Sequence, residues 1–499
     1  MLSFLHLLLI SPLLVLFLFK KFISTKNSST LPPGPRGLPI IGNLHQLDSS
    51  KLSLNLWNLS KIYGPFFSLQ IGLKPAIVVS TPKLAKVVLK DHDLDVCSRP
   101  SSLGQQKLSY NGLEMIFSPY NDSWREIRKT CVVHFFSSKR ISSYSYIRNF
   151  EVKQMIKKIC GHVDASKVTN LSEIIMSVSS AIVCRIAFGR RYEDEGIERS
   201  RFHVLLNESQ AMFITFFVSD YIPFMGWVDK LNGSLTRLEN IFKEMDLFFQ
   251  EVLDEHLDPN RERGTKEEED IVDVLLELKK HGHLSIDLTN NRIKAIIMDI
   301  LVAATDTSAA TSVWVMTGLM KNPRVMKKAK EEIRNLYSKK EFLNEDDIEK
   351  LVYLKAVIKE SLRFFAPVPL LPRETNKSII IEGYKIPPKT LVYVNIWAIQ
   401  RDPEIWNDPK EFYPERFLNN DIDFKGQDFE LIPFGAGRRI CPGISLGIAT
   451  VKLIVANLVN SFDWEMPKGM KREDIDIEGL PGLAQHKKNH LCLVAKNHI

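Results

Sequence analysis

The segment Pro433–Gly443, which reads PFGAGRRICPG, constrains the fold more than any other part of the chain. It places Cys441 in a glycine-rich loop directly before an apolar helical pattern. A helix N-terminus stabilises a thiolate through its dipole and its free N–H groups. Gly435, Gly437 and Gly443 allow the backbone to approach a flat ligand closely. The loop therefore suits a single axial thiolate on haem iron. For the cysteine taken alone, a buried structural role in a turn stays open.

A second chemical segment is Asp299–Met316, which lies in a long apolar helical pattern that begins near Thr289. It carries an ionisable group and a hydroxyl side by side, at Asp306 and Thr307. Polar groups inside an apolar helix need partners or water. Two interpretations are open, because Asp306 could be a solvated acid and Thr307 could bond back to a carbonyl.

The overall composition excludes several classes of protein. The 499 residues contain 66 basic and 59 acidic side chains, a balance of +7, and 44% are hydrophobic. These values are typical of a globular chain and exclude a disordered or fibrous one. No basic cluster is interleaved with aromatic residues, so nucleic-acid binding is not expected. The six cysteines form no Cys-x-x-Cys pair, which argues against a zinc module and fits a reducing compartment.

The N-terminal region predicts attachment to a membrane. Leu2–Phe19 is almost wholly apolar and is followed by Lys20, Lys21 and Lys26, so residues 1–20 are predicted to be a transmembrane anchor. A cleavable signal peptide is the alternative, but the basic residues follow the apolar run and no small-residue cleavage site ends it. The positive-inside rule then places the remaining chain in the cytosol.

A basic and proline-rich hinge is predicted for residues 21–43, where LPPGPRGLPIIGN forms a stiff connector. Residues 44–499 show no second linker and no repeat, so we expect one large domain. Strands are predicted at Phe66–Gly72 and Ala76–Ser80, around a turn at Lys74–Pro75. Short strands are also expected in Ser378–Ile386 and Leu391–Asn395, and most of the rest is helical in period. The fold class is therefore mainly α with small β-sheets (α+β).

The chain resembles the cytochrome P450 family. Its Phe-x-x-Gly-x-Arg-x-Cys-x-Gly signature is matched in full, and three further family motifs occur in the family's order. The matching residues are Phe434, Gly437, Arg439, Cys441 and Gly443 for the signature, then Trp124–Arg128, Glu360–Arg363 and Pro414–Phe417. Because independent motifs agree in order and spacing, the resemblance covers essentially the whole chain. It implies the cytochrome P450 fold, with a single large haem domain.

The resemblance also assigns roles to residues. It implies haem b (iron protoporphyrin IX), with Cys441 as the iron ligand. The other residues expected to bind the cofactor are Trp124, Arg128, Arg373, Phe434, Gly435, Arg439 and Gly443. Asp306 and Thr307 are expected to be catalytic, relaying or positioning protons through ordered water. Ala304 stands where the family more usually has glycine. Glu360, Arg363 and Arg416 are expected to form a buried network.

The function implied is a haem-thiolate monooxygenase that uses O2 to oxidise or hydroxylate a small apolar plant metabolite. Electrons are expected from NADPH-cytochrome P450 reductase, since the chain has no Gly-x-Gly-x-x-Gly after a strand. The expected location is the endoplasmic reticulum membrane, single-pass, with a cytosolic catalytic domain. The chain is most similar to plant microsomal A-type enzymes of specialised metabolism, in the branch with aldoxime-oxidising enzymes. The alternatives are a haem-thiolate isomerase or dehydratase that needs no O2, and a non-catalytic haem protein.

Four variable stretches are expected to contact the substrate: Ser101–Phe117, Asn207–Phe217, Ala366–Leu371 and Gly479–Ala484. Ala303 is expected beside the substrate, because it shares a helical face with Ile300 and Thr307. The remaining predicted wall is apolar and partly aromatic, and consists of Phe213, Phe216, Phe217, Val368, Leu370 and Leu483.

Overall fold

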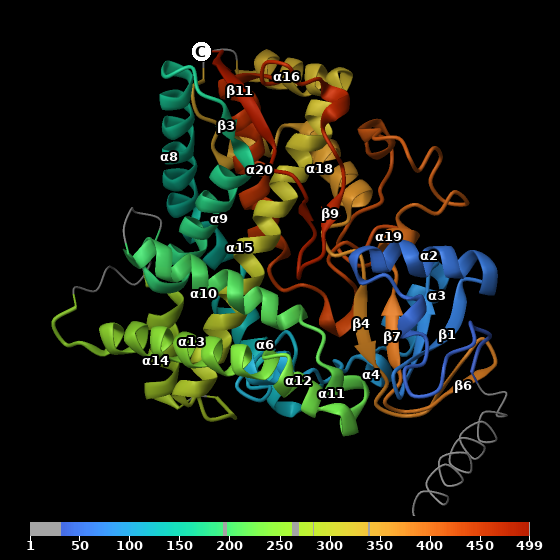
Figure 1. Cartoon of the computed structure of the whole chain (residues 1–499). Coiled ribbons are helices and arrows are strands. Elements are labelled where there is room, and N and C mark those ends of the chain that lie inside the picture. Colours follow the sequence, from blue (N-terminus) through green and yellow to red (C-terminus); the bar gives the residue numbers. More distant parts are fainter. Residues whose placement is uncertain (1–30, 193–196, 262–268, 283, 338–339, 499) are drawn as a thin grey trace, which may run out of the picture.

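The computed structural model describes residues 31–192, 197–261, 269–282, 284–337 and 340–498 (Figure 1). The predicted anchor, Leu2–Phe19, and residues 21–30 of the predicted hinge lie outside the described residues. Within them the chain is mainly helical with small sheets, as the sequence predicts. Figure 1 shows a sheet-containing part with α2 and α3 on one side and the long helices α8, α9, α15 and α20 on the other.

Helices make up most of the described chain. In the first half they are α2 (Leu52–Tyr63), α3 (Pro82–Lys86), α4 (Asp93–Val96), α5 (Leu103–Leu108), α6 (Asp122–His134), α7 (Ser138–Ser143), α8 (Ser145–Asp164), α9 (Leu171–Phe188), α10 (Ile197–Ile214), α11 (Val218–Tyr221), α12 (Trp227–Leu231) and α13 (Ser234–Leu257). In the second half they are α14 (Ile271–His281), α15 (Asn290–Lys321), α16 (Pro323–Tyr337), α17 (Glu345–Ile348), α18 (Val352–Phe365), α19 (Ile396–Ile399) and α20 (Ile444–Ser461). Short helical turns are η1 (Leu44–Gln46), η2 (Ser49–Lys51), η3 (Val87–Asp91), η4 (Pro223–Met225), η5 (Pro414–Phe417), η6 (Gly437–Arg439) and η7 (Arg472–Asp474).

The strands form four small sheets among the described residues. The largest has the order β1 (Phe66–Ile71), β2 (Lys74–Val79), β7 (Leu391–Val394), β4 (Leu371–Glu374), in which β2 and β7 are parallel and the other neighbours antiparallel. A three-stranded sheet has the order β3 (Thr169–Asn170), β11 (Cys492–Asn497), β8 (Phe462–Glu465). Two hairpins pair β5 (Ile379–Ile381) with β6 (Tyr384–Ile386) and β9 (Gly479–Leu480) with β10 (His486–Lys487).

The turn predicted at Lys74–Pro75 is wrong, because the chain reverses two residues earlier, at Gly72 and Leu73. Pro75 lies within β2, opposite Gln70 of β1. The pairing of β2 with β7 starts only at Ala76, so the missing N–H of Pro75 interrupts no bond to β7. Gly72 takes the turn with φ +59°, and a Cβ there would lie 2.6 Å from the Tyr221 carbonyl oxygen.

The long helix α15 forms the centre of the molecule. It begins after Thr289, whose side chain accepts a hydrogen bond from the Arg292 N–H at 3.3 Å. Nearly every residue from Ile293 to Met320 is buried, because α9, α18 and α20 pack around it. A helix that is apolar on all sides is typical of a core element. The hydroxyls of Ser312 and Thr317 bond back to carbonyls four residues earlier, so their polarity is satisfied inside the core.

Three described helices, α9, α15 and α20, are long and apolar enough to cross a membrane by length and composition alone. The bent pair Arg201–Tyr221 and Pro223–Leu231 passes the same test as one broken span. In α9, α15 and α20, however, 67–83% of the most apolar window is buried inside the protein. These three apolar sequences are therefore explained by the core of the domain.

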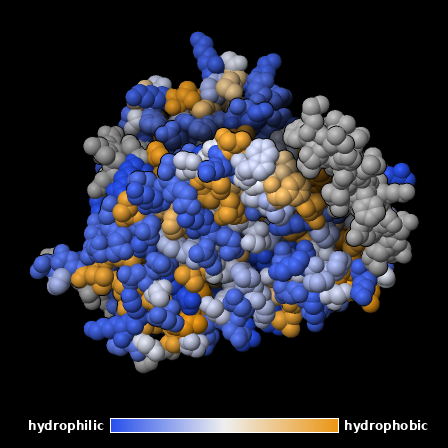
Figure 2. All heavy atoms as spheres, turned by 60° about the horizontal axis from the view of Figure 1, so that its bottom comes forward, coloured by the Kyte–Doolittle hydropathy of each residue, from blue (hydrophilic) through white to orange (hydrophobic). Residues whose placement is uncertain are grey.

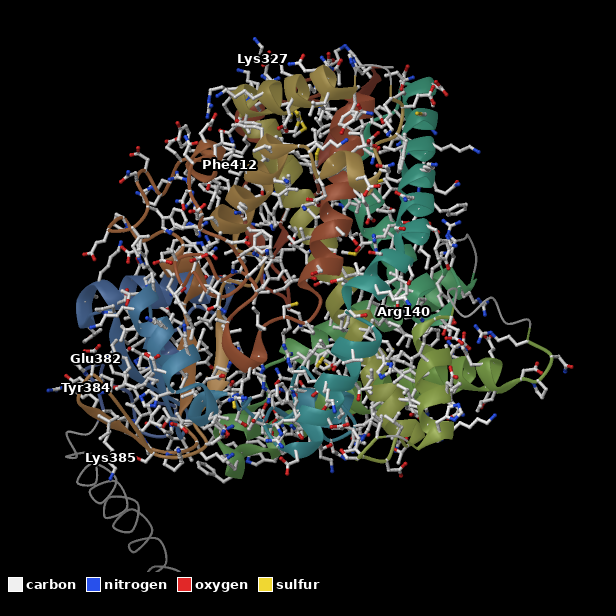
Figure 3. All side chains as sticks on the ribbon, turned by 180° about the vertical axis from the view of Figure 1, so that it is seen from behind. Arg140, Lys327, Glu382, Tyr384, Lys385 and Phe412 are labelled. Carbon is white, nitrogen blue, oxygen red and sulfur yellow. The ribbon has the colours of Figure 1, made fainter. Side chains whose placement is uncertain are left out.

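A buried ion network joins α18 to the segment around η5, as the sequence predicts. Arg363 donates to both carboxylate oxygens of Glu360, at 2.7 and 2.8 Å, and Arg416 lies 3.2 Å from the same carboxylate. Phe412, labelled in Figure 3, lies beside this network and contacts the ring of Phe365 at a centroid distance of 6.1 Å. Gly318 of α15 leaves room for the Phe412 ring, since a Cβ at residue 318 would lie 2.7 Å from that ring. Removing one charge of such a network typically costs about 3–5 kcal/mol.

Candidate active site

A cavity of about 950 Å³ lies between α15 and the loop that precedes α20. Its wall is mainly apolar, and Cys441 lies in it together with Arg99, Arg128 and Arg439. The apolar side chains include Phe117, Phe213, Ile300, Val368, Leu370 and Leu483. The Phe117 and Phe213 rings stack with centroids 4.9 Å apart and planes 19° from parallel. A cavity of this size and lining suits a small, flat, apolar molecule beside a larger planar cofactor.

The backbone conformation of the loop that carries Cys441 depends on its glycines. Gly435 and Gly437 have φ values of +72° and +70°. A Cβ on Gly437 would lie 2.2 Å from the carbonyl oxygen of Leu89, so only glycine fits there. The Cys441 N–H donates to the Phe434 carbonyl at 3.0 Å, which closes the loop on itself. Phe434, Gly435, Cys441 and Gly443 all line the cavity, as predicted for a loop that approaches a flat ligand.

Gly443 is the N-cap of α20, so the thiol lies beside the helix N-terminus. Burial raises the pKa of the Cys441 thiol, while the Gly443 N–H and the charge of Arg128 act in the opposite direction. A metal cation at the sulfur would overcome the effect of burial, because a coordinated thiol is deprotonated. The geometry therefore fits a soft axial ligand better than a free nucleophile.

Four arginines surround the same end of the cavity. Arg439 donates to the carbonyls of Cys97, Met115 and Ser118 at 2.8, 3.2 and 2.6 Å. Its guanidinium carbon lies 4.0 Å from the centre of the Trp124 ring. Arg128 donates to the Ile440 carbonyl at 2.5 Å and lies 5.6 Å from the same ring.

Arg373 and Arg99 complete the cationic end. The two guanidiniums meet at the Pro372 carbonyl, to which Arg373 donates at 3.0 Å and Arg99 at 2.7 Å. Burial lowers the pKa of Arg439 to about 9 and that of Arg99 to about 10. It also lowers the pKa of Arg373, which is further lowered by its cationic neighbours. So much buried positive charge calls for an anionic partner.

These guanidiniums are prepared for carboxylates that the protein does not supply. Among the residues that the structure describes, their hydrogen bonds go to backbone carbonyls, and the Nη2 of Arg373 has no partner although it is buried. Arginine forks match carboxylates in geometry and charge. A thiol for iron and a group of cations for two propionates are the donor set that haem requires. The residues present therefore fit this cofactor.

The two residues predicted to be catalytic lie on α15 but differ in their surroundings. Thr307 lines the cavity with Ala303, and its hydroxyl donates to the Ala303 carbonyl at 2.7 Å. Asp306 is buried and is absent from the cavity wall. It instead accepts a hydrogen bond from His486 Nε2 at 2.5 Å. The structure thus places the two side chains on different sides of one helical turn.

Sequence reasoning missed three features of this region. Arg99 belongs to the cationic end, and His486 pairs with Asp306, yet no motif connects either of them to its partner. Asp299 of α15 accepts a hydrogen bond from the Met115 N–H at 2.7 Å and lies against the carboxyl of Glu114. In the other direction, Phe217 is predicted at the cavity wall, but it is buried in the core beneath Gly104.

Comparison with known proteins gives the same assignment. The family model described as Cytochrome P450 matches residues 32–494. The 6,7,8-trihydroxycoumarin synthase of Pastinaca sativa is 48% identical over 99% of both chains. The 5-OH-xanthotoxin synthase of Ammi majus is 46% identical and covers 98% of this chain and 97% of its own. The strychnine-11-hydroxylase of Strychnos nux-vomica is 44% identical, over 96% and 94%.

A solved structure supports the fold alone. A zebrafish cytochrome P450, determined with abiraterone, matches with a TM-score of 0.74 at 23% identity, over 90% of this chain and 100% of that one. The family match over nearly the whole chain, with the cysteine loop and its cationic surroundings, identifies the chain as a member of the cytochrome P450 family and a haem-thiolate monooxygenase.

Proposed function

We propose that this monooxygenase oxidises a flat aromatic plant metabolite of about the size of a coumarin. The observation that carries the proposal is the stacked pair Phe117 and Phe213 in a wall that is otherwise apolar. Stacked aromatic rings favour flat aromatic ligands. Two relatives at 46–48% identity are named for coumarin-type products, and a third for strychnine. The two coumarin-type names favour a flat, fused-ring aromatic substrate over the simple aldoximes of the branch that the sequence suggested, whereas strychnine shares with them only a benzene ring.

The cofactor is proposed to be haem b, with Cys441 as its axial ligand. Arg128, Arg373 and Arg439 would hold the propionates, and Trp124 would support two of these guanidiniums through its ring face. Phe434, Gly435 and Gly443 would lie against the macrocycle. When bound, the haem supplies the iron chemistry that activates O2 and transfers one oxygen atom to the substrate.

Two residues of α15 are proposed to manage protons. The Thr307 hydroxyl donates its hydrogen to the Ala303 carbonyl, so its oxygen can accept a hydrogen bond from a water molecule in the cavity. That water is the proton donor on the cavity side. Asp306 supplies protons to it from the other side of the helix turn. Ala304, which also lines the cavity, adds a methyl group that narrows the space beside Thr307.

Electrons are proposed to come from NADPH-cytochrome P450 reductase. Arg125 and Lys129 are exposed on α6, the helix that also carries Trp124 and Arg128. Exposed cations next to the cofactor-binding helix suit an acidic redox partner, with attraction that weakens as salt rises. Arg125 also lies 3.2 Å from Asp122, a highly exposed carboxylate that a partner can displace.

The chain is proposed to be anchored in the endoplasmic reticulum membrane by residues 1–20, with residues 21–43 as hinge and 44–499 as the cytosolic domain. The described part of the hinge lies near α11, because the Gly72 N–H donates to the Ile41 carbonyl and the Leu73 N–H to the Tyr221 carbonyl, at 3.2 and 2.9 Å.

Exposed apolar side chains occur on both of these neighbouring segments. Leu38 and Ile40 are exposed in the hinge, and Phe224, Trp227 and Leu231 are exposed beyond α11. Figure 2 shows apolar side chains among polar ones on the face at the bottom of Figure 1. This surface supports contact with the membrane beside the anchor. Protease treatment of sealed microsomes should digest the domain and leave a short protected fragment.

The substrate proposal is tested by expression in microsomes with the reductase, followed by titration with coumarins, furanocoumarins, indole alkaloids and aldoximes. A binder should shift the haem spin state and give an NADPH-dependent product that contains one atom from labelled O2. A response to aldoximes only would refute the proposal of a flat aromatic substrate. Binding without any product under reducing conditions would refute the proposed monooxygenase reaction on that substrate.

A further inference from the structure

Asp306 and His486 form an ion pair that connects α15 to the segment near the C-terminus. The distance from His486 Nε2 to Asp306 Oδ1 is 2.5 Å. The Asp306 side chain is 6% exposed, whereas that of His486 is 31% exposed. The ring therefore extends from a buried carboxylate to the solvent.

The position of His486 is fixed by its neighbours in the chain. Its neighbour Gln485 accepts a hydrogen bond from Trp314 Nε1 of α15 at 2.7 Å, and donates its own N–H to the Pro367 carbonyl at 2.7 Å. Pro481, Gly482 and Leu483, a few residues earlier, line the cavity. One short segment thus forms part of the cavity wall and carries the histidine on the outer side of α15.

The other charged groups near His486 are already paired. On its own strand, Lys487 lies 2.5 Å from Asp476, and the next residue, Lys488, lies 2.8 Å from Glu478. The facing strand β9 contributes only Gly479 and Leu480, and α15 contributes Asp306. Within the described ranges, His486 is the residue that forms an ion pair with Asp306. Its second ring nitrogen has no protein partner there, so water can reach it.

We propose that His486 supplies protons to Asp306 from the solvent and so acts as a positioning residue for oxygen activation. The ring takes up a solvent proton at Nδ1 and passes its Nε2 proton to Oδ1, and the resulting carboxylic acid passes that proton to water on the Thr307 side. Before the next transfer the ring exchanges protons with solvent and returns to the tautomer that carries its proton on Nε2. Each turnover of a monooxygenase consumes two protons and two electrons with one O2, and leaves water and oxidised product. This inference rests on the proposed role of Asp306 and adds the route by which that acid is recharged.

The first test measures the product formed per NADPH consumed in His486→Gln. Glutamine keeps an N–H donor for Asp306 but cannot carry a proton through its side chain. We expect the ratio to fall about 3–10-fold, less than the ~10²–10⁴ of a full general acid because water can substitute. Substrate affinity should not change. His490→Gln, an exposed histidine on the same segment, is the matched control and should behave as the wild type.

A double variant separates this inference from the proposal on which it rests. If His486 acts through Asp306, then Asp306→Asn combined with His486→Gln should be no worse than Asp306→Asn alone. Additive losses would overturn the inference. A normal ratio in Asp306→Asn would instead refute the role of Asp306, whereas a loss in Asp306→Asn with a normal His486→Gln would refute only the role of His486.

A third measurement does not depend on turnover. Diethylpyrocarbonate modifies accessible histidine nitrogens, and peptide mass spectrometry reports the rate for each histidine. In the holoenzyme, Asp306→Ala removes the acceptor and should make Nε2 reactive in addition to Nδ1, so His486 should form the doubly modified product several-fold faster while His490 keeps its rate. Equal rates of double modification at His486 in the wild type and in Asp306→Ala would show that the pair does not exist in solution, and the inference would fall with it.

Discussion

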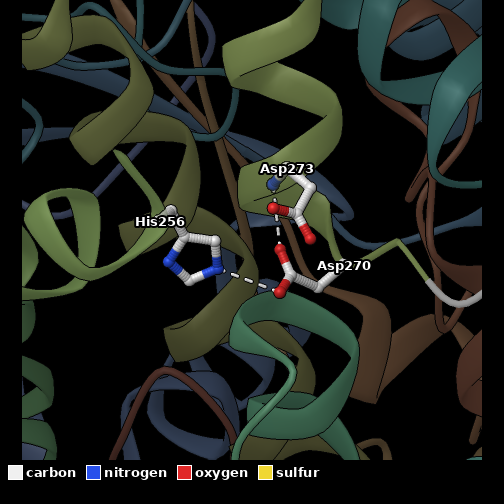
Figure 4. Close-up of side chains that lie close together, drawn as sticks. All are labelled: His256, Asp270 and Asp273. Atoms are coloured by element: carbon white, nitrogen blue, oxygen red, sulfur yellow. Dashed lines mark hydrogen bonds and ion pairs between the residues drawn. The ribbon is translucent and has the colours of Figure 1, made fainter. Parts of the chain in front are cut away.

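Two of the histidine–aspartate pairs among the described residues, His256–Asp270 and His486–Asp306, lie in different surroundings. His256 of α13 contacts Asp270, the N-cap of α14, at 2.9 Å, and each side chain is only 2% exposed (Figure 4). The His256 Nδ1 faces the Val252 carbonyl at 2.7 Å. Both ring nitrogens are therefore occupied by protein partners. In the pair of His486 and Asp306, by contrast, one nitrogen remains free for water.

The surroundings of Asp270 explain why the first pair is static. Its carboxylate also accepts from Arg261 at 2.9 Å and from the Asp273 N–H at 2.9 Å. Arg261 donates to Asp273 as well, at 2.8 Å. Although His256, Asp270 and Asp273 place ligand atoms within 4.8 Å of one another, the Arg261 guanidinium already bridges the two carboxylates. A pair that is closed at both ends stabilises two helices, whereas a pair open at one end can exchange its proton.

Cys441→Ala should have the largest effect of all, because it removes the chemistry of the site and leaves these two pairs unchanged. This variant should lose the long-wavelength Soret band of the reduced CO complex completely, together with all product, because Cys441 carries the only thiol among the described residues that line the cavity. Both histidine–aspartate pairs should stay intact, as shown by unchanged diethylpyrocarbonate rates at His256 and His486. A persisting long-wavelength band would show that another residue ligates the iron.

His256→Ala removes one member of the buried pair His256 and Asp270. We expect the free energy of unfolding to fall by about 3–5 kcal/mol, because the remaining buried charge loses its partner. Denaturant unfolding of the holoenzyme measures it. The product formed per NADPH in the remaining folded protein should equal that of the wild type. His490→Ala provides the exposed control, for which we expect a change within about 0.5 kcal/mol. A loss of coupling in His256→Ala without a loss of stability would reverse the comparison.

Thr307→Ala tests the proton route of the pair His486 and Asp306, because Thr307 lies on the cavity side of the same helix turn. The haem spectrum and substrate affinity should persist while NADPH use continues, product falls about tenfold and peroxide rises. This loss corresponds to ~1.4 kcal/mol in the competition between oxygen transfer and release. Thr317→Ala, which removes a similar back-bonded hydroxyl further along α15 and away from the cavity lining, is the control. Equal ratios in Thr307→Ala and the wild type would mean that protons bypass Thr307.

The smallest expected effect is on stability and concerns Asp299, another buried acid of α15. Burial first, then the charge and the hydrogen bond of Glu114, raise the pKa of Asp299 well above its ordinary value. A raised carboxyl pKa adds stability below the unfolded pKa, and this stability is lost as pH rises through the folded value. Asp299→Asn should therefore be more stable than the wild type at neutral pH, because the amide does not have to ionise in the buried site.

The same difference should vanish below about pH 4, where the wild-type acid is protonated in both states. Denaturant unfolding of both proteins between about pH 3 and pH 8 measures it. An unchanged or growing advantage at low pH would mean that the titration of Asp299 does not cause the effect. His486→Gln should show no comparable gain at neutral pH, because it removes a favourable pair rather than a repulsion.

Local patterns predicted the elements well, whereas contacts between distant segments escaped them. The start of α15 near Thr289 followed from the apolar periodicity, and the Cys441 loop from its glycines. The turn after β1 was misplaced because Pro75 was taken for a turn residue, although a proline is also tolerated where its N–H would have no partner. Phe217 was misplaced because composition alone cannot tell on which side of a segment a ring lies.

The pairing of Asp306 with His486 could not be predicted, since 180 residues separate them and no local motif links them. The same holds for Arg99, whose role follows only from its meeting Arg373 at the Pro372 carbonyl. Charges brought together by the fold leave no periodic trace in the sequence. Such groups are visible only in three dimensions, through burial and unpaired donors.

The segment from Pro481 to His486 has a consequence for evolution and for engineering. Leu483 helps to shape the cavity, and His486 lies three residues further along the same short connection, which Gln485 attaches to α15 and to Pro367. A change that widens the cavity at Leu483 also shifts the histidine. Selection for a new substrate at this position therefore carries a risk of leaked peroxide, and libraries that diversify residues 481–483 should be screened for both properties together.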